Sequence, residues 1–444
     1  MKVSDILALR GDEIPSVLLV PVMSDSDEDS CIVIEEGLSL LQFLSVNLNR
    51  DATSRCRLGF WTCNAEGPLE PIATINNEVN VDGKKMLSGG SIWGLVRTAA
   101  LEIDSRKISI VCIDTDSSLS ENDMIVQVGH ELLVDGDNNM PVPEVAYRGK
   151  QRFERRLSHS SQPDIIKPSE CEEEPSIGIS IITGGLGGLG LVTAETLVEL
   201  GATHVVLISR SGKVKNYEGQ DLQKRLNRLL EVRDGTAVSV ECCDMCDEDA
   251  VCTFLKKVHE KYGRINTLIH ASGVVDDGLI MKQNEKTIRK VFGPKAKGAW
   301  FLHKHTLIDN LKNFIVFSSV AALFGNIGQA NYSASNAYID TLIRYRRSLS
   351  YSGISIQWPG IADLGMGAAM NTEIRMNREL MLEISYVKMV LRKMLHSCED
   401  VYIEPIQAPL VREILNEDII LPRLRDFTSS VIIARDENNS KAVI

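Results

Sequence analysis

The chain has 444 residues, 44% of them hydrophobic, and a formal net charge of −12 at pH 7. This length suits two or three globular domains, and the negative charge argues against nucleic acid or an acidic membrane surface as the main partner. The sequence has no run of about eighteen or more apolar residues and no signal-peptide pattern near its start. We therefore expect a cytoplasmic protein without a membrane-spanning segment.

Residues 1–156 alternate strand-like and helix-like segments, an arrangement typical of α/β proteins. No glycine-rich turn connects a strand to a helix in this part, so we expect a structural role for it rather than nucleotide binding. The predicted strands cover 17–20, 31–34, 58–63, 108–113 and 145–147, and the predicted helices cover 38–48, 91–101 and 124–133.

Residues 157–176 are rich in Ser, Pro and Glu, a composition typical of a linker. They separate the first subdomain from a second one, which we expect to span residues 177–427. Residues 428–444 are predicted to be a frayed tail.

The second subdomain opens with a strand at 179–182, a glycine-rich turn, a helix at 191–200 and a strand at 204–208. Gly185, Gly187 and Gly190 follow the pattern G-x-G-x-x-G, and their place between a strand and a helix is the context of a dinucleotide-binding turn. Glycines at these positions let the backbone approach a pyrophosphate at the amino end of the helix. The turn therefore predicts a dinucleotide cofactor.

The end of the next strand indicates which dinucleotide binds. About twenty residues past Gly190, where an acid would hold a ribose 2′-hydroxyl, the chain has Ser209 and Arg210. An arginine accommodates a 2′-phosphate instead. The sequence therefore favours NADPH over NADH.

Strands at 238–242 and 265–269 end beside further candidate cofactor contacts. Asp244 follows the first strand and could bind the adenine amine, and the small residues 271–273 after the second would let a ribose lie close. Asp276 and Asp277 in the next loop are either functional acids or loop and capping residues before a helix at 284–292.

Residues 295–336 contain four side chains that suit ketone reduction. The predicted strand at 314–317 leads to Ser319, whose hydroxyl would lie at the carboxyl edge of the sheet. Tyr332 and Asn336 share one face if Tyr332 opens a helix. A phenol can protonate the alkoxide that forms as hydride reaches a ketone, provided that a cation such as Lys295 lowers its pKa. Ser319 would donate a hydrogen bond to the carbonyl oxygen.

The last part contains a strand at 354–358 and a methionine-bearing segment at 365–381. This segment is either a flexible lid over an acyl chain or an ordinary packed helix. A helix, a strand at 401–403 and a helical tail are predicted for 385–427. The ten cysteines are scattered, and the pair Cys243 and Cys246 has no second ligand pair at a suitable spacing. We therefore predict reduced thiols and no metal site.

Together these motifs resemble the ketoreductase domain of modular polyketide synthases, within the short-chain dehydrogenase/reductase superfamily. The specific feature is the order of Lys295, Tyr332 and Asn336, because common short-chain reductases have the lysine four residues after the tyrosine and the asparagine earlier. The first half resembles the family's catalytically empty structural subdomain at 91–97, Glu102 and 145–148. The resemblance covers roughly residues 15–415.

The resemblance implies an α/β fold of two Rossmann-like subdomains, a truncated structural one and a doubly wound catalytic one that binds NADPH. It implies that Tyr332 donates the proton and that Ser319 orients the ketone. Lys295 would lower the tyrosine pKa and contact the cofactor ribose, and Asn336 would hold a proton-relay water. The residues then expected to contact the cofactor are Thr183, Gly184, Gly185, Leu186, Gly187, Gly188, Leu189, Gly190, Ser209, Arg210, Asp244, Met245, His270, Ala271, Ser272, Gly273, Pro359 and Gly360.

Residues 275–277 resemble the Leu-Asp-Asp marker of B-type domains, which guide the pantetheine arm to give a D-hydroxyl. Phe324 stands where A-type domains have tryptophan, and Asn331 before the tyrosine also agrees with the B type. Val275, Ile327 and the order Trp-Pro-Gly at 358–360 depart from the family pattern. The residues expected to contact the substrate or control stereochemistry are Asp277, Phe324, Gln329 and Met366.

The expected function is NADPH-dependent reduction of a β-ketoacyl thioester on an acyl carrier protein, in polyketide or fatty-acid-like biosynthesis. Other synthase domains or subunits would be partners, and nucleic acid and membranes would not. Two alternatives stay open: a reductase of a free small ketone, and a non-catalytic scaffold domain of a megasynthase. The presence of all four catalytic residues argues against the scaffold.

Overall fold

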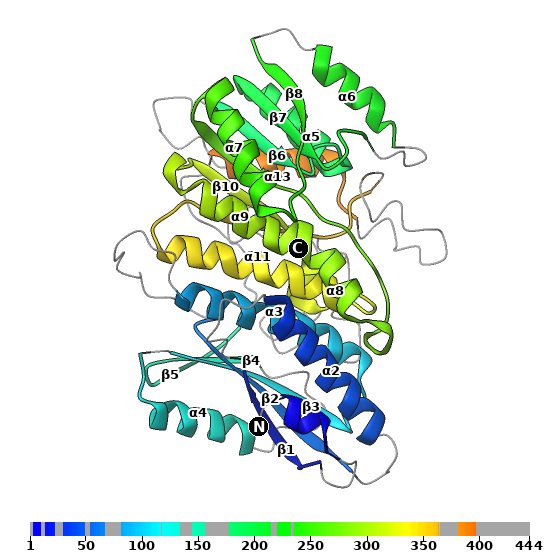
Figure 1. The fold of residues 1–444 in the computed structure, drawn as a ribbon, viewed down its shortest axis with the longest axis vertical. Coiled ribbons are helices and arrows are strands. Elements are labelled where there is room, and N and C mark those ends of the chain that lie inside the picture. Colours follow the sequence, from blue (N-terminus) through cyan, green and yellow to red (C-terminus); the bar gives the residue numbers. More distant parts are fainter. Residues whose placement is uncertain are drawn as a thin grey trace, which may run out of the picture.

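The computed structural model describes residues 3–9, 14–22, 30–48, 54–66, 81–116, 118–133, 144–155, 177–214, 220–231, 235–362, 364 and 381–396. These residues form two α/β subdomains whose sheets lie on opposite sides of a layer of helices (Figure 1). The predicted linker at 157–176, the methionine-bearing segment up to residue 380, the strand at 401–403 and the tail at 428–444 lie outside the described residues.

The first subdomain is built on a five-stranded sheet in the order β1-β2-β3-β4-β5. Strands β1 to β4 are parallel, and β5 pairs antiparallel with β4. Helices α2 and α3 cover the face toward the second subdomain, and α4 covers the other face (Figure 1). The elements are α1 (Val3–Leu7), β1 (Val17–Pro21), α2 (Ser30–Leu48), β2 (Cys56–Cys63), α3 (Val81–Glu102), β3 (Ile108–Thr115), α4 (Glu121–Leu133), β4 (Glu144–Arg148) and β5 (Gln151–Glu154).

The predicted strand at 31–34 is wrong, because these residues belong to α2. Cys31, Ile34, Leu38 and Leu41 are all buried, and a spacing of three or four residues is one face of a helix. A short β-branched run resembles a strand when it is considered alone, but packing against α3 stabilises the helix. The predicted helix at 38–48 is the second half of α2.

Among the described residues, α2 is the one helix that is long and apolar enough to cross a membrane. It packs against α1, α3 and α8, and Ile34, Leu40, Leu41 and Leu44 are fully buried. A core helix of a globular protein has the same length and composition. In this fold α2 is such a core helix.

The second subdomain contains a parallel six-stranded sheet in the order β11-β10-β9-β6-β7-β8. The chain adds β7 and β8 on one side of β6, then β9, β10 and β11 on the other. The strand order therefore reverses between β6 and β9, and open α/β sheets bind ligands beyond the carboxyl ends of the strands at this point. The elements are β6 (Ile179–Thr183), α5 (Gly188–Glu199), β7 (His204–Ser209), α6 (Leu222–Glu231), β8 (Ala237–Cys242), α7 (Glu248–Tyr262), β9 (Ile265–His270), α8 (Glu285–Phe292), α9 (Gly298–His305), β10 (Asn313–Ser319), α10 (Val320–Phe324), α11 (Ala330–Ser348), β11 (Ile354–Trp358) and α13 (Ile384–His396).

The two subdomains share one hydrophobic core. Helices α5, α6 and α13 pack on one face of the large sheet, and α7, α9 and α11 pack on the other. The core on this second face continues through Trp93 of α3 and Leu41 of α2. Helix α3 lies directly against α11 (Figure 1), so the first subdomain supports the helix that carries Tyr332.

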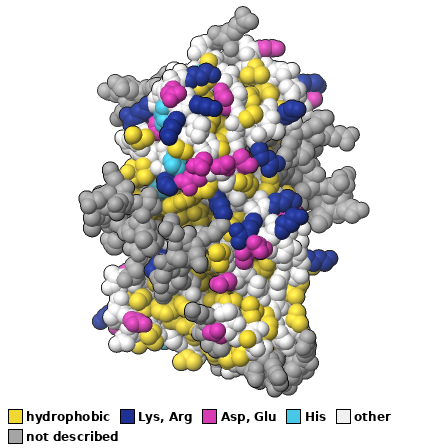
Figure 2. Space-filling view, viewed as in Figure 1, with side chains coloured by type: hydrophobic (Ala, Val, Ile, Leu, Met, Phe, Trp, Pro, Cys, Tyr) yellow, Lys and Arg dark blue, Asp and Glu magenta, His cyan; other side chains and the backbone are white. Residues whose placement is uncertain are grey.

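The surface differs between the subdomains. Acidic and basic side chains are interspersed over the upper and middle parts of the face in Figure 2, while hydrophobic side chains gather over the first subdomain. Three apolar residues of α4 in this subdomain are strongly exposed: Ile125, Val126 and Leu133.

Candidate active site

The predicted site residues lie at the carboxyl ends of the strands of the large sheet. Thr183 ends β6, Ser209 ends β7, His270 ends β9 and Ser319 ends β10. Thr183 and His270 are paired across the strand-order reversal between β6 and β9. Pro359 and Gly360 follow β11 directly, and Asp244 and Met245 follow β8.

The glycine-rich turn runs from β6 into the amino end of α5. Gly184 has φ of +65°, and a Cβ on it would lie 2.7 Å from the carbonyl oxygen of Ala271. A Cβ on Gly190 would lie 2.4 Å from the carbonyl oxygen of Gly184, so α5 can begin this close to the turn only with glycine there. No described side chain caps the first amides of α5 at Gly187. Unpaired amides at a helix amino end suit a pyrophosphate, so the turn fits a dinucleotide.

His270 connects the strand before the turn to the segment that carries Lys295. The side chain is fully buried, and burial together with the nearby Lys295 charge lowers its pKa to about 3. Its Nε2 lies 2.8 Å from the carbonyl oxygen of Lys295, and its Nδ1 lies 2.7 Å from Oγ1 of Thr183. A neutral ring must donate from Nε2 to a carbonyl, so Nδ1 accepts from the Thr183 hydroxyl. The histidine thus fixes both neighbours.

The residues predicted to bind the adenosine half of the cofactor lie near one another. Arg210 is exposed after β7. Burial raises the pKa of the Cys246 thiol, and Arg210 lies close enough for its charge to oppose that shift. The Cys246 backbone N–H donates to the Asp244 carboxylate over 3.0 Å. Met245 is buried at the same turn. An exposed guanidinium beside this turn is suited to a phosphate on the adenosine ribose.

Tyr332 and Asn336 lie one turn apart in α11, as the sequence predicts. Ser319 ends β10 and caps α10, accepting from the Ala321 N–H over 3.2 Å. The Ser319 and Asn336 side chains both lie close enough to the Tyr332 hydroxyl to influence its pKa. The structure therefore brings the phenol, hydroxyl and amide together.

Lys295 lies in a single π-helical turn at Gly293–Lys297. Its side chain is 3% exposed, and its Nζ donates to the carbonyl oxygen of Phe317 over 2.8 Å. The Nζ lies 5.6 Å from the centre of the Tyr332 ring. Burial lowers the pKa of Lys295 to about 8. A π-turn re-aims side chains within a helix and is frequent at functional sites.

The expectation that Lys295 lowers the tyrosine pKa is not met in this structure. The pKa of Tyr332 is raised, chiefly by burial and also by the Asp277 carboxylate. Asn336 and Ser319 oppose this shift. Lys295 donates to the carbonyl oxygen of Phe317. Because the pKa of Tyr332 is raised above its ordinary value, the phenol is protonated at neutral pH and can act as an acid.

Asn336 retains an unused hydrogen-bonding atom. Its Nδ2 donates to the Tyr332 carbonyl oxygen over 2.8 Å. Its Oδ1 is buried and has no hydrogen-bond partner among the described residues. A buried orphan acceptor usually bonds a water, so this atom fits the water-holding role implied by the resemblance.

A pair of loops borders this site. Gln329 is buried, and its Nε2 donates to both carboxylate oxygens of Asp277 at 3.2 Å. Phe324 is half-buried at the end of α10. Met366, the fourth residue predicted to face the substrate, lies outside the described residues.

Three residues around the site have no role assigned from the sequence, although Asn331 agrees with the B type and Glu102 belongs to the resemblance of the first half. Asn331 donates to the backbone of Asp276 over 2.9 Å and accepts from the Tyr332 N–H over 2.7 Å. Asp340 is buried, accepts from Ser355 and Gln357 at 2.6 Å each and acts electrostatically on Lys295. Glu102 reaches the bordering loops from α3. The spacing of Tyr332, Asn336 and Asp340 on one helix face is the signal that could have identified Asp340.

Comparison with known proteins agrees with this geometry. The family model described as the KR domain matches residues 178–363. Over 285 residues the chain is 32% identical to the chalcone synthase cfoA of Aspergillus candidus. The matched stretch is 64% of this chain and 10% of that protein. Over 273 residues it is 33% identical to the polyketide synthase GfsB of Streptomyces halstedii. That stretch is 61% of this chain and 4% of GfsB. The chain thus spans a small part of the length of these relatives.

Solved structures share the whole two-subdomain architecture. The structure of A-type ketoreductases from a modular polyketide synthase matches with a TM-score of 0.75 at 24% identity, over 97% of this chain and 86% of that one. The first ketoreductase of the tylosin PKS matches with a TM-score of 0.70 at 22% identity, over 97% and 88%. At these identities the likeness shows the fold.

The matched residues 178–363 run from β6 to β11 and include the glycine-rich turn, Lys295, Ser319, Tyr332 and Asn336. Residues 178–363 of this chain therefore match the KR domain, and the chain as a whole shares the fold of ketoreductases from modular polyketide synthases.

Proposed function

We propose that this protein reduces a β-ketoacyl thioester, carried on an acyl carrier protein, to the β-hydroxyacyl thioester with NADPH. The observation that carries the proposal is the grouping of Tyr332, Ser319 and Asn336 at the carboxyl end of β10, with the Lys295 Nζ 5.6 Å from the centre of the Tyr332 ring. Four side chains of these types close together suit proton delivery to a ketone oxygen.

The chain's own residues supply orientation and the proton. The bound nicotinamide would supply a hydride to the carbonyl carbon. The Ser319 hydroxyl would donate a hydrogen bond to the ketone oxygen, which fixes the carbonyl beside the phenol. The Tyr332 hydroxyl would transfer its proton to the same oxygen as the negative charge develops there. A water on the free Asn336 Oδ1 would return a proton to the phenolate.

NADPH is proposed over NADH because Arg210 stands at the end of β7 where an acid would select NADH. The glycine-rich turn from Gly184 to Gly190 would bind the pyrophosphate through backbone amides. The remaining predicted contacts lie at the ends of neighbouring strands, which supports one extended cofactor site.

We further propose that the product has a D-hydroxyl and that the protein works together with other synthase domains. Asp277 beside Gln329, and Phe324 in place of tryptophan, support the B type and hence a D-hydroxyl. The relatives are multidomain synthases, and the exposed apolar residues of α4 support contact with another synthase domain. Residues 1–156 would serve as the structural subdomain, residues 177–427 as the catalytic one, and the protein would work in the cytoplasm.

The test is an assay of the purified protein with NADPH and a β-ketoacyl N-acetylcysteamine thioester, with the alcohol resolved by chiral chromatography. We expect NADPH oxidation faster than NADH oxidation, with the D-alcohol as product. Tyr332→Phe should lower kcat by about 10²- to 10⁴-fold, the usual contribution of general acid catalysis, without weakening NADPH binding.

Tyr386→Phe, which removes a phenol from α13 away from the site, is the matched control and should keep wild-type turnover. Equal turnover by the Tyr332→Phe protein would refute the mechanism. Equal rates on thioesters and simple ketones would refute the carrier-bound substrate.

A further inference from the structure

Glu102 ends α3 in the first subdomain, yet its carboxylate binds two loops of the second. Its Oε2 accepts from the Ile280 N–H over 2.6 Å, and its Oε1 accepts from the Gly328 N–H over 2.7 Å. Both are short, charge-assisted hydrogen bonds from backbone groups. One carboxylate therefore connects residues 276–283 with residues 324–329, which we call the paired loops.

The paired loops lie beside Tyr332, because Asn331 bonds both the Asp276 carbonyl oxygen and the Tyr332 N–H. Gly328 directly precedes Gln329, whose amide bonds the Asp277 carboxylate. The Gly278 N–H also donates to the Gly328 carbonyl oxygen over 2.8 Å, which connects the loops to each other. A shift of Gly328 would thus move Gln329 and Asp277 together.

Apolar burial does little to hold the paired loops in place. Leu279, Met281 and Ile327 are 48%, 50% and 60% exposed, whereas Ile280 alone among these four is buried. The three exposed side chains line an open hollow of about 460 Å³ together with Glu102. Segments with few buried contacts depend on their hydrogen bonds for a fixed conformation.

Other polar groups of the first subdomain support the same loops. Gln42 of α2 donates from Nε2 to the carbonyl oxygens of Ile280 and Gln283 at 2.7 and 2.9 Å. Thr98 of α3 accepts from the Asn326 N–H over 3.2 Å. These bonds are made by neutral groups, whereas Glu102 supplies the charge-assisted pair that reaches both loops at once.

We propose that Glu102 is a positioning residue for reduction: from the first subdomain, it fixes the paired loops so that Asp277 and Gln329 hold the substrate in one orientation. This inference rests on the proposed function. It makes the first subdomain a determinant of substrate binding and of product stereochemistry as well as a scaffold.

The experiment compares the full chain with Glu102→Gln and with Asp104→Asn. Glutamine keeps the size of the side chain, but its NH₂ group cannot accept from a backbone N–H, so at least one loop is released. Asp104→Asn is the matched control. It also removes one negative charge, two residues after Glu102, but the Asp104 carboxylate bonds Arg106.

Hydrogen exchange is the readout that does not depend on activity. In Glu102→Gln we expect exchange about tenfold faster in the paired loops, as for loss of a charge-assisted hydrogen bond. Exchange in the glycine-rich turn at 184–190 and the NADPH dissociation constant should stay at the wild-type values. Unchanged exchange in the paired loops would overturn the proposal.

Kinetics then test the positioning role. With the thioester substrate, we expect Glu102→Gln to raise KM about tenfold, to change kcat much less, and to lower the ratio of D- to L-alcohol. Faster loop exchange with an unchanged KM and alcohol ratio would overturn it. Failure of the wild type itself to reduce the thioester while binding NADPH would refute the proposed function, and loop exchange would then show whether Glu102 still fixes the loops.

Discussion

Lys295 is a cation buried beneath Tyr332, the proposed proton donor, and this arrangement has a thermodynamic cost. Its side chain is 3% exposed, and burial lowers its pKa to about 8, against about 10.4 for an unperturbed lysine. The unfolded chain therefore holds this proton more tightly than the native protein does. Linkage then requires the free energy of unfolding to rise with pH between about 8 and about 10 on account of this group.

Lys295→Met should separate stability from function. Methionine removes the buried charge at similar volume, so at pH 7 we expect the free energy of unfolding to increase by about 3 kcal/mol, while reductase activity falls. The gain over wild type should shrink as pH rises to about 10, because the wild-type lysine is then neutral. Urea unfolding at both pH values measures it. A gain that does not change with pH would contradict the assigned pKa.

At the scale of single residues, the sequence predicts types and spacings but not electrostatic directions. Tyr332 and Asn336 fall on one helix face because the spacing of four residues is intrinsic to a helix. The sign of the tyrosine shift depends on desolvation, which arises only once α11 is packed. The hydrogen-bond partners of Asp340 and Glu102 also come from other elements of the fold, so no local sequence pattern reveals these partners.

At the scale of elements, α11 depends on its contact with α3. A Cβ on Gly90 would lie 2.0 Å from Oγ1 of Thr341, and a Cβ on Gly94 would lie 2.4 Å from the carbonyl oxygen of Ser333. Glycine at these positions lets the two helices approach closely. Thr98, one turn further along α3, bonds the Ser333 hydroxyl over 2.9 Å, so the contact continues beside Tyr332.

Gly94→Ala tests this contact. Alanine favours a helix over glycine by up to about 1 kcal/mol, but at this position the added methyl must push α11 away. We expect a net loss of about 1–3 kcal/mol in the free energy of unfolding, as for overpacked cores, together with lower kcat. Gly129→Ala in α4 is the matched control, since its Cβ would meet no described atom within 4 Å. That variant should be more stable than wild type by thermal unfolding; a similar gain in Gly94→Ala would contradict the close contact.

The prediction of α2 shows where element-level inference fails. Residues 31–34 have the composition of a short strand, and the buried positions of α2 repeat every three or four residues through to Leu48. The periodicity supports a helix only when the whole segment is considered. Contact with α3 and α8 provides the stabilisation that composition does not reveal.

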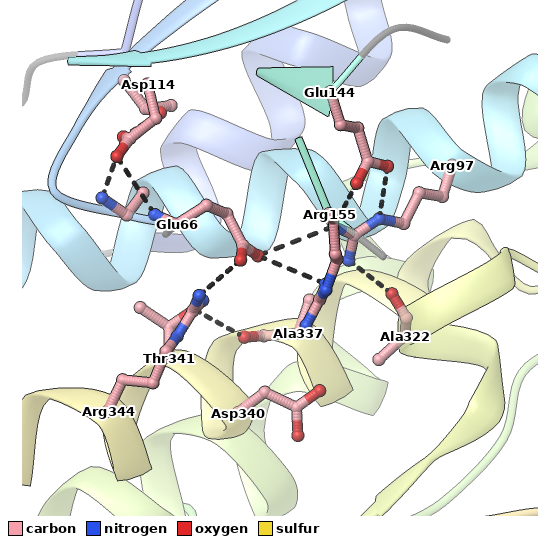
Figure 3. Close-up of polar contacts among 12 residues, drawn as sticks. Glu66, Arg97, Asp114, Glu144, Arg155, Ala322, Ala337, Asp340, Thr341 and Arg344 are labelled. Carbon is pink, nitrogen blue, oxygen red and sulfur yellow. Dashed lines mark hydrogen bonds and ion pairs between the residues drawn. The ribbon is translucent and has the colours of Figure 1, made fainter. Parts of the chain in front are cut away.

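At the scale of the whole molecule, a buried ion network joins the subdomains (Figure 3). Arg97 of α3 binds Glu144 through two hydrogen bonds of 2.8 and 2.9 Å and lies 3.6 Å from Glu66. It also donates to the carbonyl oxygen of Ala322 in α10 over 2.6 Å. Arg344 of α11 binds Glu66 from the other side. Burial alone would raise the pKa of Glu66, but Arg344, Arg155 and Arg97 hold it below its ordinary value.

Arg97→Met should weaken the connection between the subdomains. The change removes the Arg97 guanidinium from Glu144 and removes the bond to Ala322, three residues after Ser319. Breaking a buried ion pair on one side costs about 3–5 kcal/mol, so we expect a loss of that size in urea unfolding. Arg106→Met removes an exposed guanidinium bound to Asp104 and should leave the midpoint almost unchanged. An Arg97→Met midpoint equal to that of Arg106→Met would show that the network does not stabilise the fold.

The sequence by itself determined the glycine-rich turn, the α/β class of both halves and the order of the proposed catalytic residues. These features follow from local rules: glycine where the backbone must approach a ligand, apolar periodicity within an element, and side-chain types matched to a reaction. Only the tertiary structure decided the direction of the Tyr332 pKa, the helical state of residues 31–34, and the contacts of Arg97 and Glu102 with the second subdomain. The Tyr332 pKa depends on burial, and the helical state of residues 31–34 depends on the packing of whole elements. Arg97 and Glu102 bond partners more than forty residues away in the chain. A local sequence pattern encodes none of these.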